Sequence, residues 1–351
     1  MKIKSFLNFA FTALLILGVS VSCRNDDNTD ILPPDPGLLY ENGFLISNEG
    51  NFGTPTASVD FIPNDFSEPV FDIYSKANNG ESLGDVLQNI YLKDNAAFLV
   101  LNNSNKIVVV NRYTFNKIGE ITDHINLPRY ATSTDNYLYV SNSGNPASIS
   151  VYNLQDLSFV KEIPVNTTAE YIVNASDKIF VQNASFGFGN SLSLIDPSSQ
   201  SVTSSIDLPK GQLQKIVSDG TQVYALASDD SADSYIYKIT PSGNISETID
   251  LIGISGARNL ELDSGKFYFT AGLDVYQMDA TSNNIPASPI FTAAESAPYS
   301  GLYGFSVIDG KIFTADASGF TADSEVTVYN TSGDILKTFK AGRGTNSFYK
   351  N

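Results

Sequence analysis

One pattern of hydrophobic and polar positions recurs along most of this 351-residue chain. In its clearest copy, at 136–154, an apolar run rich in β-branched and aromatic residues precedes a Ser-Gly-Asn-Pro turn and a second run in which polar and apolar residues alternate. Such runs favour strands, whereas Gly, Asn and Pro favour turns. The unit therefore predicts a β-hairpin.

Seven apolar runs align with the first run of that hairpin. They begin at residues 44, 98, 138, 179, 223, 267 and 312, at intervals of 54, 40, 41, 44, 44 and 45 residues. A repeat of about 40–50 residues built from short strands is typical of a propeller blade. Since four strand-like runs fit each period, we predict an all-β fold, a seven-bladed β-propeller with four-stranded blades. Two β-sandwich domains are the alternative, but they give no reason for seven aligned copies.

The two ends of the repeat array indicate how the ring closes. The first copy begins with its second run at Phe44, and a surplus strand-like run, 346–349, follows the last copy. We therefore expect the C-terminal strand to join blade one as its innermost strand, which removes an exposed sheet edge. The long first interval carries an insertion at 75–88, where Leu83, Val86 and Leu87 suggest a helical turn that narrows the central mouth.

The N-terminus predicts export. Lys2 and Lys4 precede an apolar run, 6–21, that is too short to remain as a membrane span. The run ends in Val-Ser-Cys, and the only cysteine, Cys23, resembles the lipidated cysteine of bacterial lipoproteins; a free thiol in a soluble secreted protein is the alternative. We therefore predict a signal peptide over 1–22, lipidation at Cys23, a flexible acidic and Pro-rich tether over 23–42, and the propeller over 43–351.

The charge of the chain excludes one class of partner. The formal net charge is −17, and it becomes −19 when residues 1–22 are removed with their two lysines. An acidic surface repels phosphate backbones, and the sequence has no Lys/Arg stripe of the kind that nucleic-acid binding requires. We expect no nucleic-acid partner.

The loops at one rim of the predicted ring are the best candidates for a binding site, because the loops after the second strands and those entering the first strands meet there. The second run ends in Asn in blades one to four, and in Ala227, Ala271 and Asp316 in blades five to seven. Asn at such ends either closes the strand through local hydrogen bonds or forms a polar arc on one side of the rim. The candidate ligand-binding residues are Asn48, Glu49, Asn51, Phe52, Asp85, Asn103, Arg129, Tyr130, Asn142, Asn145, Tyr171, Phe186, Phe188, Arg258, Tyr303 and Arg343.

Two of these candidates stand out. Phe186 and Phe188 alternate with glycines, a setting that is hard to place in a core and that favours an exposed aromatic platform for a ligand. Aromatic and Arg residues are also enriched in binding sites because they give a large contact area or directional donors.

The sequence offers little evidence of a catalytic motif, so we expect that the protein is not an enzyme and has no catalytic residues. His124 is the only histidine, and no zinc spacing, phosphate loop or EF-hand series occurs. We expect no cofactor and no metal ligand set, although carboxylates that meet at the mouth of the ring would leave an oxygen-only Ca²⁺ site open.

Two motifs carry a family resemblance. The segments NEGNFG at 48–53 and NGESLGDVLQ at 79–88 resemble the DUF5074 group of Bacteroidota surface propellers, within the YncE/YVTN-like class. Some members are cobalamin-capturing lipoproteins that sit on TonB-dependent transporters. The acidic residues after Cys23 likewise resemble a surface-export signal of Bacteroidota lipoproteins.

The resemblance implies an outer-membrane lipoprotein, held by its lipid and facing the cell exterior, that binds a small ligand such as cobalamin or another corrinoid on the rim and delivers it to a TonB-dependent transporter. An adhesion propeller that binds polysaccharide or protein is the alternative from a second class. A metal-dependent propeller lactonase or lyase is the third.

Overall fold

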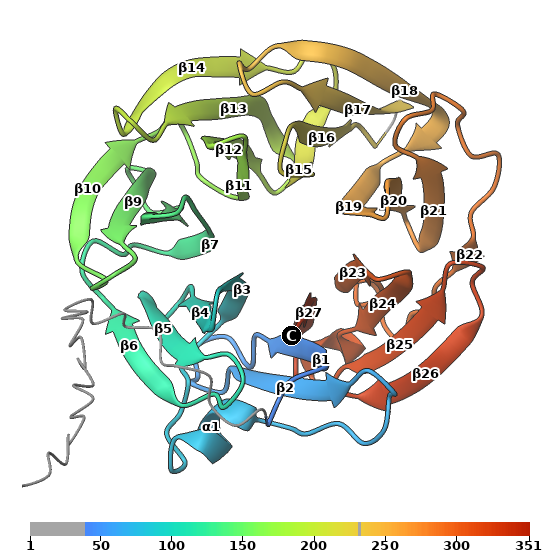
Figure 1. The fold of residues 1–351 in the computed structure, drawn as a ribbon. Helices are drawn as coiled ribbons and strands as arrows, with labels where there is room; N and C mark the ends of the chain where they lie inside the picture. Colours follow the sequence, from blue (N-terminus) through green and yellow to red (C-terminus); the bar gives the residue numbers. More distant parts are fainter. Residues whose placement is uncertain (1–38, 231–232) are drawn as a thin grey trace, which may run out of the picture.

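The computed structural model describes residues 39–230 and 233–351, so the predicted signal peptide, Cys23 and the tether before residue 39 lie outside the described residues. Seven antiparallel sheets stand around a central axis as the blades of a propeller (Figure 1). The predicted all-β, seven-bladed propeller is confirmed.

The innermost strands line the axis, and the second strands lie directly outside them. From blade one to blade seven, the innermost strands are β27 (Thr345–Lys350), β3 (Leu87–Lys93), β7 (Pro128–Ser133), β11 (Ile172–Ala175), β15 (Gln212–Ser218), β19 (Ala257–Asp263) and β23 (Gly304–Ile308). The second strands are β1 (Gly43–Asn48), β4 (Ala96–Leu101), β8 (Tyr137–Asn142), β12 (Lys178–Ser185), β16 (Val223–Ser228), β20 (Lys266–Ala271) and β24 (Lys311–Asp316).

The outer half of each blade completes the ring. The third strands are β2 (Ser58–Pro63), β5 (Lys106–Asn111), β9 (Ser148–Asn153), β13 (Phe188–Asp196), β17 (Asp233–Ile239), β21 (Asp274–Asp279) and β25 (Glu325–Asn330). In blades two to seven the fourth strands are β6 (Lys117–Ile121), β10 (Phe159–Pro164), β14 (Ser201–Asp207), β18 (Ile245–Ser255), β22 (Phe291–Thr292) and β26 (Ile335–Lys340). Blade one has a single bridge, Phe61 to Val70, in place of a fourth strand.

The second strands are apolar because both of their faces are buried between neighbouring blades. In β8, Leu138 and Val140 pack against blade two, whereas Tyr139 packs against blade four. Each such buried side chain stabilises the fold by about 1.5–3 kcal/mol relative to exposure. This two-sided burial explains the continuous apolar runs in the repeat.

The C-terminal strand closes the ring as predicted. Strand β27 pairs antiparallel with β1, and Ile46 stands opposite Phe348. Blade two also holds the end of the chain, because Arg112 Nε donates to Asn351 Oδ1 at 2.7 Å and Arg112 Nη2 donates to the Lys350 carbonyl at 3.0 Å.

The insertion in the first interval differs from its prediction. A short helix, α1 (Ile73–Ala77), forms before residue 83. Leu83, in non-helical backbone, and Leu87, the first residue of β3, enter the core between blades one and two, and Val86 is buried in non-helical backbone. Helix α1 lies on the outer side of β2 (Figure 1), and Ile73 and Tyr74 are fully buried there. The helix therefore covers the outer side of blade one, where a fourth strand is missing, and the predicted helical turn at the central mouth is wrong. Of the insertion, Gln88 reaches the axis.

Candidate functional site

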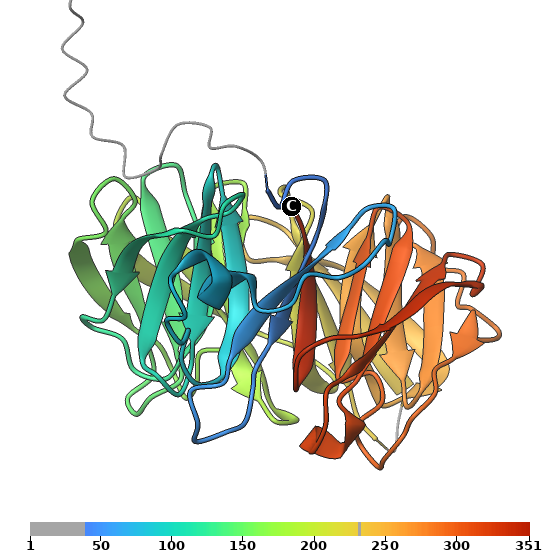
Figure 2. The same cartoon turned by 90° about the horizontal axis from the view of Figure 1, so that it is seen from below.

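Successive strands of a blade run in opposite directions, so the loops after the second strands and the loops that enter the innermost strands share one face. We call this the rim face. The described chain enters β1 at the opposite face, where the Asn351 N–H donates to the Gly43 carbonyl at 3.0 Å. In the side view of Figure 2 the C-terminus marks that opposite face.

The Asn residues at or near the ends of the second strands of blades one to four are structural. Asn48, Asn142 and Asn183 are buried. Asn48 Nδ2 donates to Asp60 at 2.9 Å and its Oδ1 accepts from Thr345 at 2.6 Å. Asn102 Nδ2 donates to the Pro128 carbonyl at 3.0 Å. These amides fasten each strand end to nearby backbone and side chains, which is the first of the two interpretations that the sequence left open.

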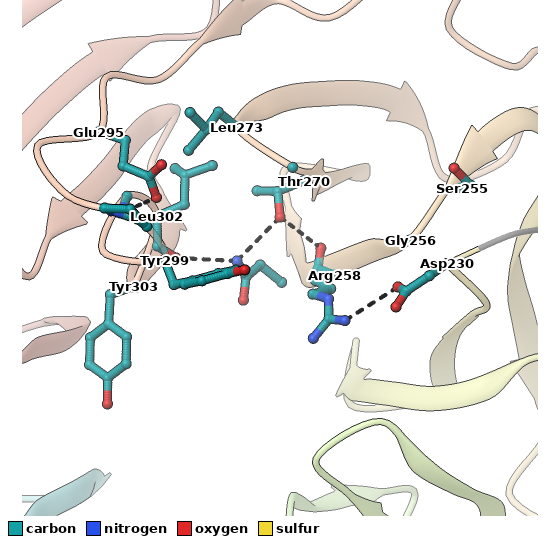
Figure 3. Close-up of a pocket in the computed structure, with 14 residues that line it drawn as sticks. Asp230, Ser255, Gly256, Arg258, Thr270, Leu273, Glu295, Tyr299, Leu302 and Tyr303 are labelled. Carbon is teal, nitrogen blue, oxygen red and sulfur yellow. Dashed lines mark hydrogen bonds and ion pairs between the residues drawn. The ribbon is translucent and has the colours of Figure 1, made fainter. Parts of the chain in front are cut away.

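The rim opens between blades five, six and seven. A cavity of about 930 Å³, which we call the rim cavity, lies there (Figure 3). Its lining residues come from the loop after β16, from the end of β18, from β19 and the residue before it, from the end of β20 and the turn after it, and from the loop between blades six and seven. They are Asp230, Ser255, Gly256, Arg258, Asn259, Thr270, Gly272, Leu273, Glu295, Pro298, Tyr299, Gly301, Leu302 and Tyr303.

A short turn leaves this cavity uncovered. Only Gly272 and Leu273 connect β20 to β21, and Gly272 has a φ of 58°. A tight hairpin commonly demands such a left-handed residue, which Gly adopts without steric cost. By contrast, residues 49–57 and 317–324 connect the second and third strands of blades one and seven, and these longer loops build up the rim.

The wall of the rim cavity is both polar and aromatic. Arg258 Nη2 lies 3.5 Å from Asp230 Oδ1, and this pair is exposed. Asn259 Nδ2 donates to Thr270 Oγ1 at 3.2 Å. Tyr299 is 92% exposed, so its ring is free to pack on a ligand. The wall thus offers a cation, an amide and an aromatic face to one bound molecule.

The axis holds two smaller spaces. The upper chamber, next to the rim, has a volume of about 170 Å³ and is lined by Glu49, Gln88, Tyr130, Tyr171, Lys215, Asn259, Tyr303, Phe305, Asn346 and Ser347. The lower chamber, of about 300 Å³, shares Tyr130, Tyr171, Lys215 and Ser347 with it and adds Asn89, Ala131, Ile172, Glu261, Ser306, Ile308, Phe348 and Tyr349.

The axial side chains form ordered contacts. The rings of Tyr130 and Tyr171 stack with centroids 4.1 Å apart. Arg129 Nε pairs with Glu170 at 2.8 Å, and Lys215 Nζ pairs with Glu261 at 2.7 Å. Burial raises the pKa of the Glu261 carboxyl and raises the pKa of the Tyr171 hydroxyl to about 12.

The candidates from the sequence divide into three groups. Arg258 and Tyr303 line the rim cavity. Glu49, Tyr130, Tyr171 and Tyr303 line the upper chamber, and Arg129 joins them through its bond to Gln88 at 2.6 Å. The remaining candidates lie elsewhere on the rim face, in blades one to four and in the loop that leads to β27.

The candidates near blades one and two hold a loop together. Arg343 Nη1 donates to Asn51 Oδ1, and Asp85 Oδ2 accepts from Asn103 Nδ2 and, at 3.0 Å, from the Gly53 N–H. Phe52 projects from this loop and is exposed. In blades three and four, Asn145 precedes a cis proline, while Phe186 and Phe188 are 90% and 79% exposed. None of these residues lines the rim cavity.

Several lining residues were not among the sequence candidates. Tyr299 and Gly272 of the rim cavity and Lys215 of the two axial chambers are absent from the candidates. A sequence signal existed for Gly272, because blade six has an unusually short interval between its second and third runs. No comparable signal marks Lys215, since it faces the axis next to a bulge at Leu213 to Lys215.

The groups that would support metal or histidine chemistry do not converge. Within residues 39–230 and 233–351, no group of three or more His, Cys, Asp or Glu residues is placed to hold a metal ion. His124 stacks on Phe159 with centroids 3.6 Å apart. No helix in the described part of the chain is long and apolar enough to cross a membrane.

The fold and its rim define the class of protein, a seven-bladed β-propeller with a ligand-sized cavity on one face. Residues 42–346 match the model of a domain of unknown function, DUF5074. The chain therefore belongs to the DUF5074 family, which confirms the family that the two sequence motifs indicated. No curated protein matches it significantly.

Solved structures share the propeller architecture. A quinonprotein alcohol dehydrogenase-like protein from Bacteroides thetaiotaomicron has a TM-score of 0.70 and 14% identity, and the match covers 90% of this chain and 79% of that chain. The dihydro-heme d1 dehydrogenase NirN has a TM-score of 0.59 and 11% identity, covering 91% and 78%. Virginiamycin B lyase from Staphylococcus aureus has a TM-score of 0.53 and 12% identity, covering 71% and 82%. At these identities the likeness concerns the fold alone.

Proposed function

We propose that this protein is a cell-surface lipoprotein that captures a corrinoid in the rim cavity and passes it, without chemistry, to a TonB-dependent outer-membrane transporter. The rim cavity carries the proposal. Its volume of about 930 Å³ lies near the upper end of the range, about 300–1,000 Å³, typical of small-molecule sites. Its mixed wall suits a large, mostly neutral ligand that has amide groups and a flat face.

The surface around the rim cavity supports contact with a partner protein. Large apolar side chains are exposed on the rim face in most blades and their connections. They are Phe52, Leu127, Phe186, Phe188, Ile252, Tyr299 and Phe320. A broad display of aromatic side chains on one face is a feature of protein interaction surfaces. A transporter that contacts this face would enclose a ligand held in the rim cavity.

The predicted anchor is compatible with this orientation. In the proposal, lipid at Cys23 tethers the protein to the outer membrane, and the chain reaches the propeller at Tyr40, whose N–H donates to the Tyr113 carbonyl at 3.0 Å. Since β1 begins at the face opposite the rim, an anchor on that side leaves the rim face free for ligand and partner.

Isothermal titration of the mature chain with cyanocobalamin and with cobinamide tests the proposal. We expect saturable binding that weakens about tenfold in Arg258→Ala, because a hydrogen bond from a charged donor contributes about 1.5–3 kcal/mol. Lys337→Ala on an outer strand is the matched control and should bind as the wild type does. Absence of heat with both corrinoids, together with an unchanged melting temperature at high excess, would remove the corrinoid proposal.

One observation favours a second candidate function, an adhesion propeller. Phe186 and Phe188 are highly exposed yet lie outside the rim cavity, so they are placed to meet a polysaccharide or a protein surface. A glycan array probed with the wild type and with the Phe186→Ser/Phe188→Ser variant tests it. Binding that depends on both rings, without corrinoid binding, would favour adhesion over capture.

A further inference from the structure

The upper chamber contains a half-buried carboxylate, that of Glu49, which forms no ion pair within the described residues. Glu49 Oε2 accepts a hydrogen bond from the Tyr303 hydroxyl at 2.8 Å, and Oε1 accepts from Asn346 Nδ2 at 3.0 Å. Both donors are neutral. Within the described residues Glu49 takes part in no ion pair, and burial raises the pKa of its carboxyl.

The other charges that face this part of the axis are already paired. Arg129 is held by Glu170 and by Gln88 Oε1, and Glu170 Oε1 also accepts from Ser185 at 2.8 Å. Lys215 is held by Glu261. Among these five groups the carboxylates outnumber the cations by one. A charge shielded from water is more stable when it is paired. The charge of Arg129 acts on Glu49 without an ion pair, so a further positive charge in contact with Glu49 would balance this group of side chains.

Aromatic rings surround that position. Tyr130, Tyr171, Tyr303 and Phe305 line the upper chamber, and the faces of such rings attract cations. One internal example exists already, because the Lys215 ammonium lies 5.4 Å from the centroid of the Tyr171 ring. The volume of about 170 Å³ corresponds to on the order of five waters, which exceeds a bare ion and suits a small organic molecule.

The backbone is shaped to present these side chains. The innermost strands carry bulges or register shifts at their rim ends, between Leu87 and Asn89, between Pro128 and Ala131, and between Arg258 and Glu261. A similar shift occurs where β27 meets the end of β1. A bulge breaks the alternation of a strand and redirects side chains. Here the displaced residues include chamber-lining side chains such as Gln88, Tyr130 and Asn259.

The upper chamber adjoins the rim cavity. Asn259 and Tyr303 line both the rim cavity and the upper chamber, so the two spaces meet at these side chains. Tyr303 packs edge-on against Phe320 with centroids 4.7 Å apart, and its hydroxyl reaches Glu49. The rim cavity is therefore the side from which the ligand proposed below would reach the chamber.

We propose that the upper chamber binds a small organic ammonium ion, whose positive charge pairs with Glu49 and lies against the rings of Tyr303, Tyr130 and Tyr171. Recognition here rests on charge and on the axial rings, so this proposal does not depend on the corrinoid proposed for the rim cavity, although the two sites share Asn259 and Tyr303. An ammonium-bearing ligand neutralises Glu49 and fills the chamber without disturbing the Arg129 and Lys215 ion pairs.

Calorimetric titration with choline, and with its uncharged analogue in which a carbon atom replaces the nitrogen, tests the site in the full mature chain. We expect choline to bind at least about tenfold more tightly than the analogue, because only choline carries the charge that Glu49 and the rings attract. Equal affinities, or no binding of choline, would overturn the proposal. Potassium chloride is the third ligand, and binding as tight as that of choline would overturn the assignment to an organic cation.

Variants separate recognition from folding. Glu49→Gln keeps the shape of the side chain and should lower choline affinity about tenfold or more, whereas the exposed Glu68→Gln is the matched control and should not change it. Tyr303→Phe keeps the ring and should bind choline within about threefold of the wild type, while Tyr303→Leu should bind it more weakly. Choline affinity should also rise with pH, since the raised pKa of Glu49 leaves more of the carboxyl protonated at low pH. Unchanged affinity in Glu49→Gln would contradict the proposal even if that variant were less stable.

Discussion

The ends of the second strands are held differently in blades one to four and in blades five and six. In the first group an Asn lies at or near the end of each second strand and forms hydrogen bonds to nearby backbone and side chains. Asn183, for example, donates to the Thr168 carbonyl at 2.7 Å and accepts from Ser193 at 2.6 Å. In the second group Ala227 and Ala271 occupy the equivalent positions, and their side chains form no such hydrogen bonds. The rim cavity opens where the fastening amides are missing.

The difference shows that a repeated polar residue need not be part of the ligand site. Asn recurs because it stabilises a strand end, and that role buries it. The positions that depart from the repeat, such as Arg258, Gly272 and Tyr299, are the ones that meet the rim cavity. Asp316 in blade seven behaves like the asparagines, since its Oδ1 accepts from Ser296 Oγ at 2.9 Å and from the Ser318 N–H at 2.8 Å.

The largest effect that we expect comes from removing a fastening amide. Asn48→Ala leaves Asp60 and Thr345 without their buried partner and should lower the free energy of unfolding by about 2–3 kcal/mol. Urea denaturation measures this change. Asn136→Ala, in the exposed turn before β8, is the control and should change stability by less than about 0.5 kcal/mol. If the two variants were equally stable, the structural role of the asparagines would be wrong.

A substitution in the open part of the rim, between blades five, six and seven, should change ligand affinity more than stability. The Arg258–Asp230 pair is exposed, so Arg258→Ala should change the free energy of unfolding by less than about 1 kcal/mol while it lowers corrinoid affinity about tenfold. Thermal denaturation and titration of the same sample measure both quantities. A large loss of stability with unchanged corrinoid affinity would contradict the ligand-binding role that we assign to the open part of the rim.

Stability should depend on pH through Glu49. Its pKa is raised in the folded protein, so the unfolded chain releases this proton first, and stability falls as pH increases through the interval between the unfolded and folded pKa values. Glu49→Gln should remove that part of the decrease when denaturation is followed from about pH 4 to about pH 7. Parallel pH profiles for the two proteins would show that the carboxyl is not perturbed.

The smallest effect should come from the exposed rings of blade four. Phe186→Ser/Phe188→Ser should leave both the unfolding free energy and the corrinoid affinity unchanged within about 0.5 kcal/mol, because neither ring lines the rim cavity. Binding of a partner protein or glycan is the property that should change. A tenfold loss of corrinoid affinity in this variant would mean that the ligand site extends across the ring.

The fold was predictable because its signal is repeated seven times. Buried second strands such as 138–142 must be apolar on both faces, and their spacing fixes the blade length. Helix α1 could not be predicted, because it is short and its segment has no long apolar period. A local cap fixes its start, since the Ser75 N–H donates a hydrogen bond to Asp72 Oδ1 at 3.2 Å. Burial of Ile73 and Tyr74 then decides its position, and that contact with blade one cannot be seen in local sequence.

The candidate site was predictable only in part. The rim could be assigned from strand direction, and it led to Arg258, Tyr303 and the axial residues Glu49, Tyr130 and Tyr171. The convergence of residues from different blades was not predictable, because Lys215 and Glu261 meet across a distance of 46 positions in the chain through bulges that leave no clear sequence pattern. Exposure of Asn residues could not be judged from the sequence for the same reason, since it depends on partners in neighbouring loops.

A blocking substitution tests the central claim most directly. Ser255 lies on the wall of the rim cavity and is exposed, so Ser255→Trp should fill part of the cavity without disturbing the core. Titration with cyanocobalamin should show at least a tenfold loss of affinity relative to Ser332→Trp, an exposed substitution in the turn between β25 and β26 on the opposite face, with equal melting temperatures for the two variants. Equal affinity of the two Trp variants for cyanocobalamin would contradict the assignment of the ligand to the opening between blades five, six and seven.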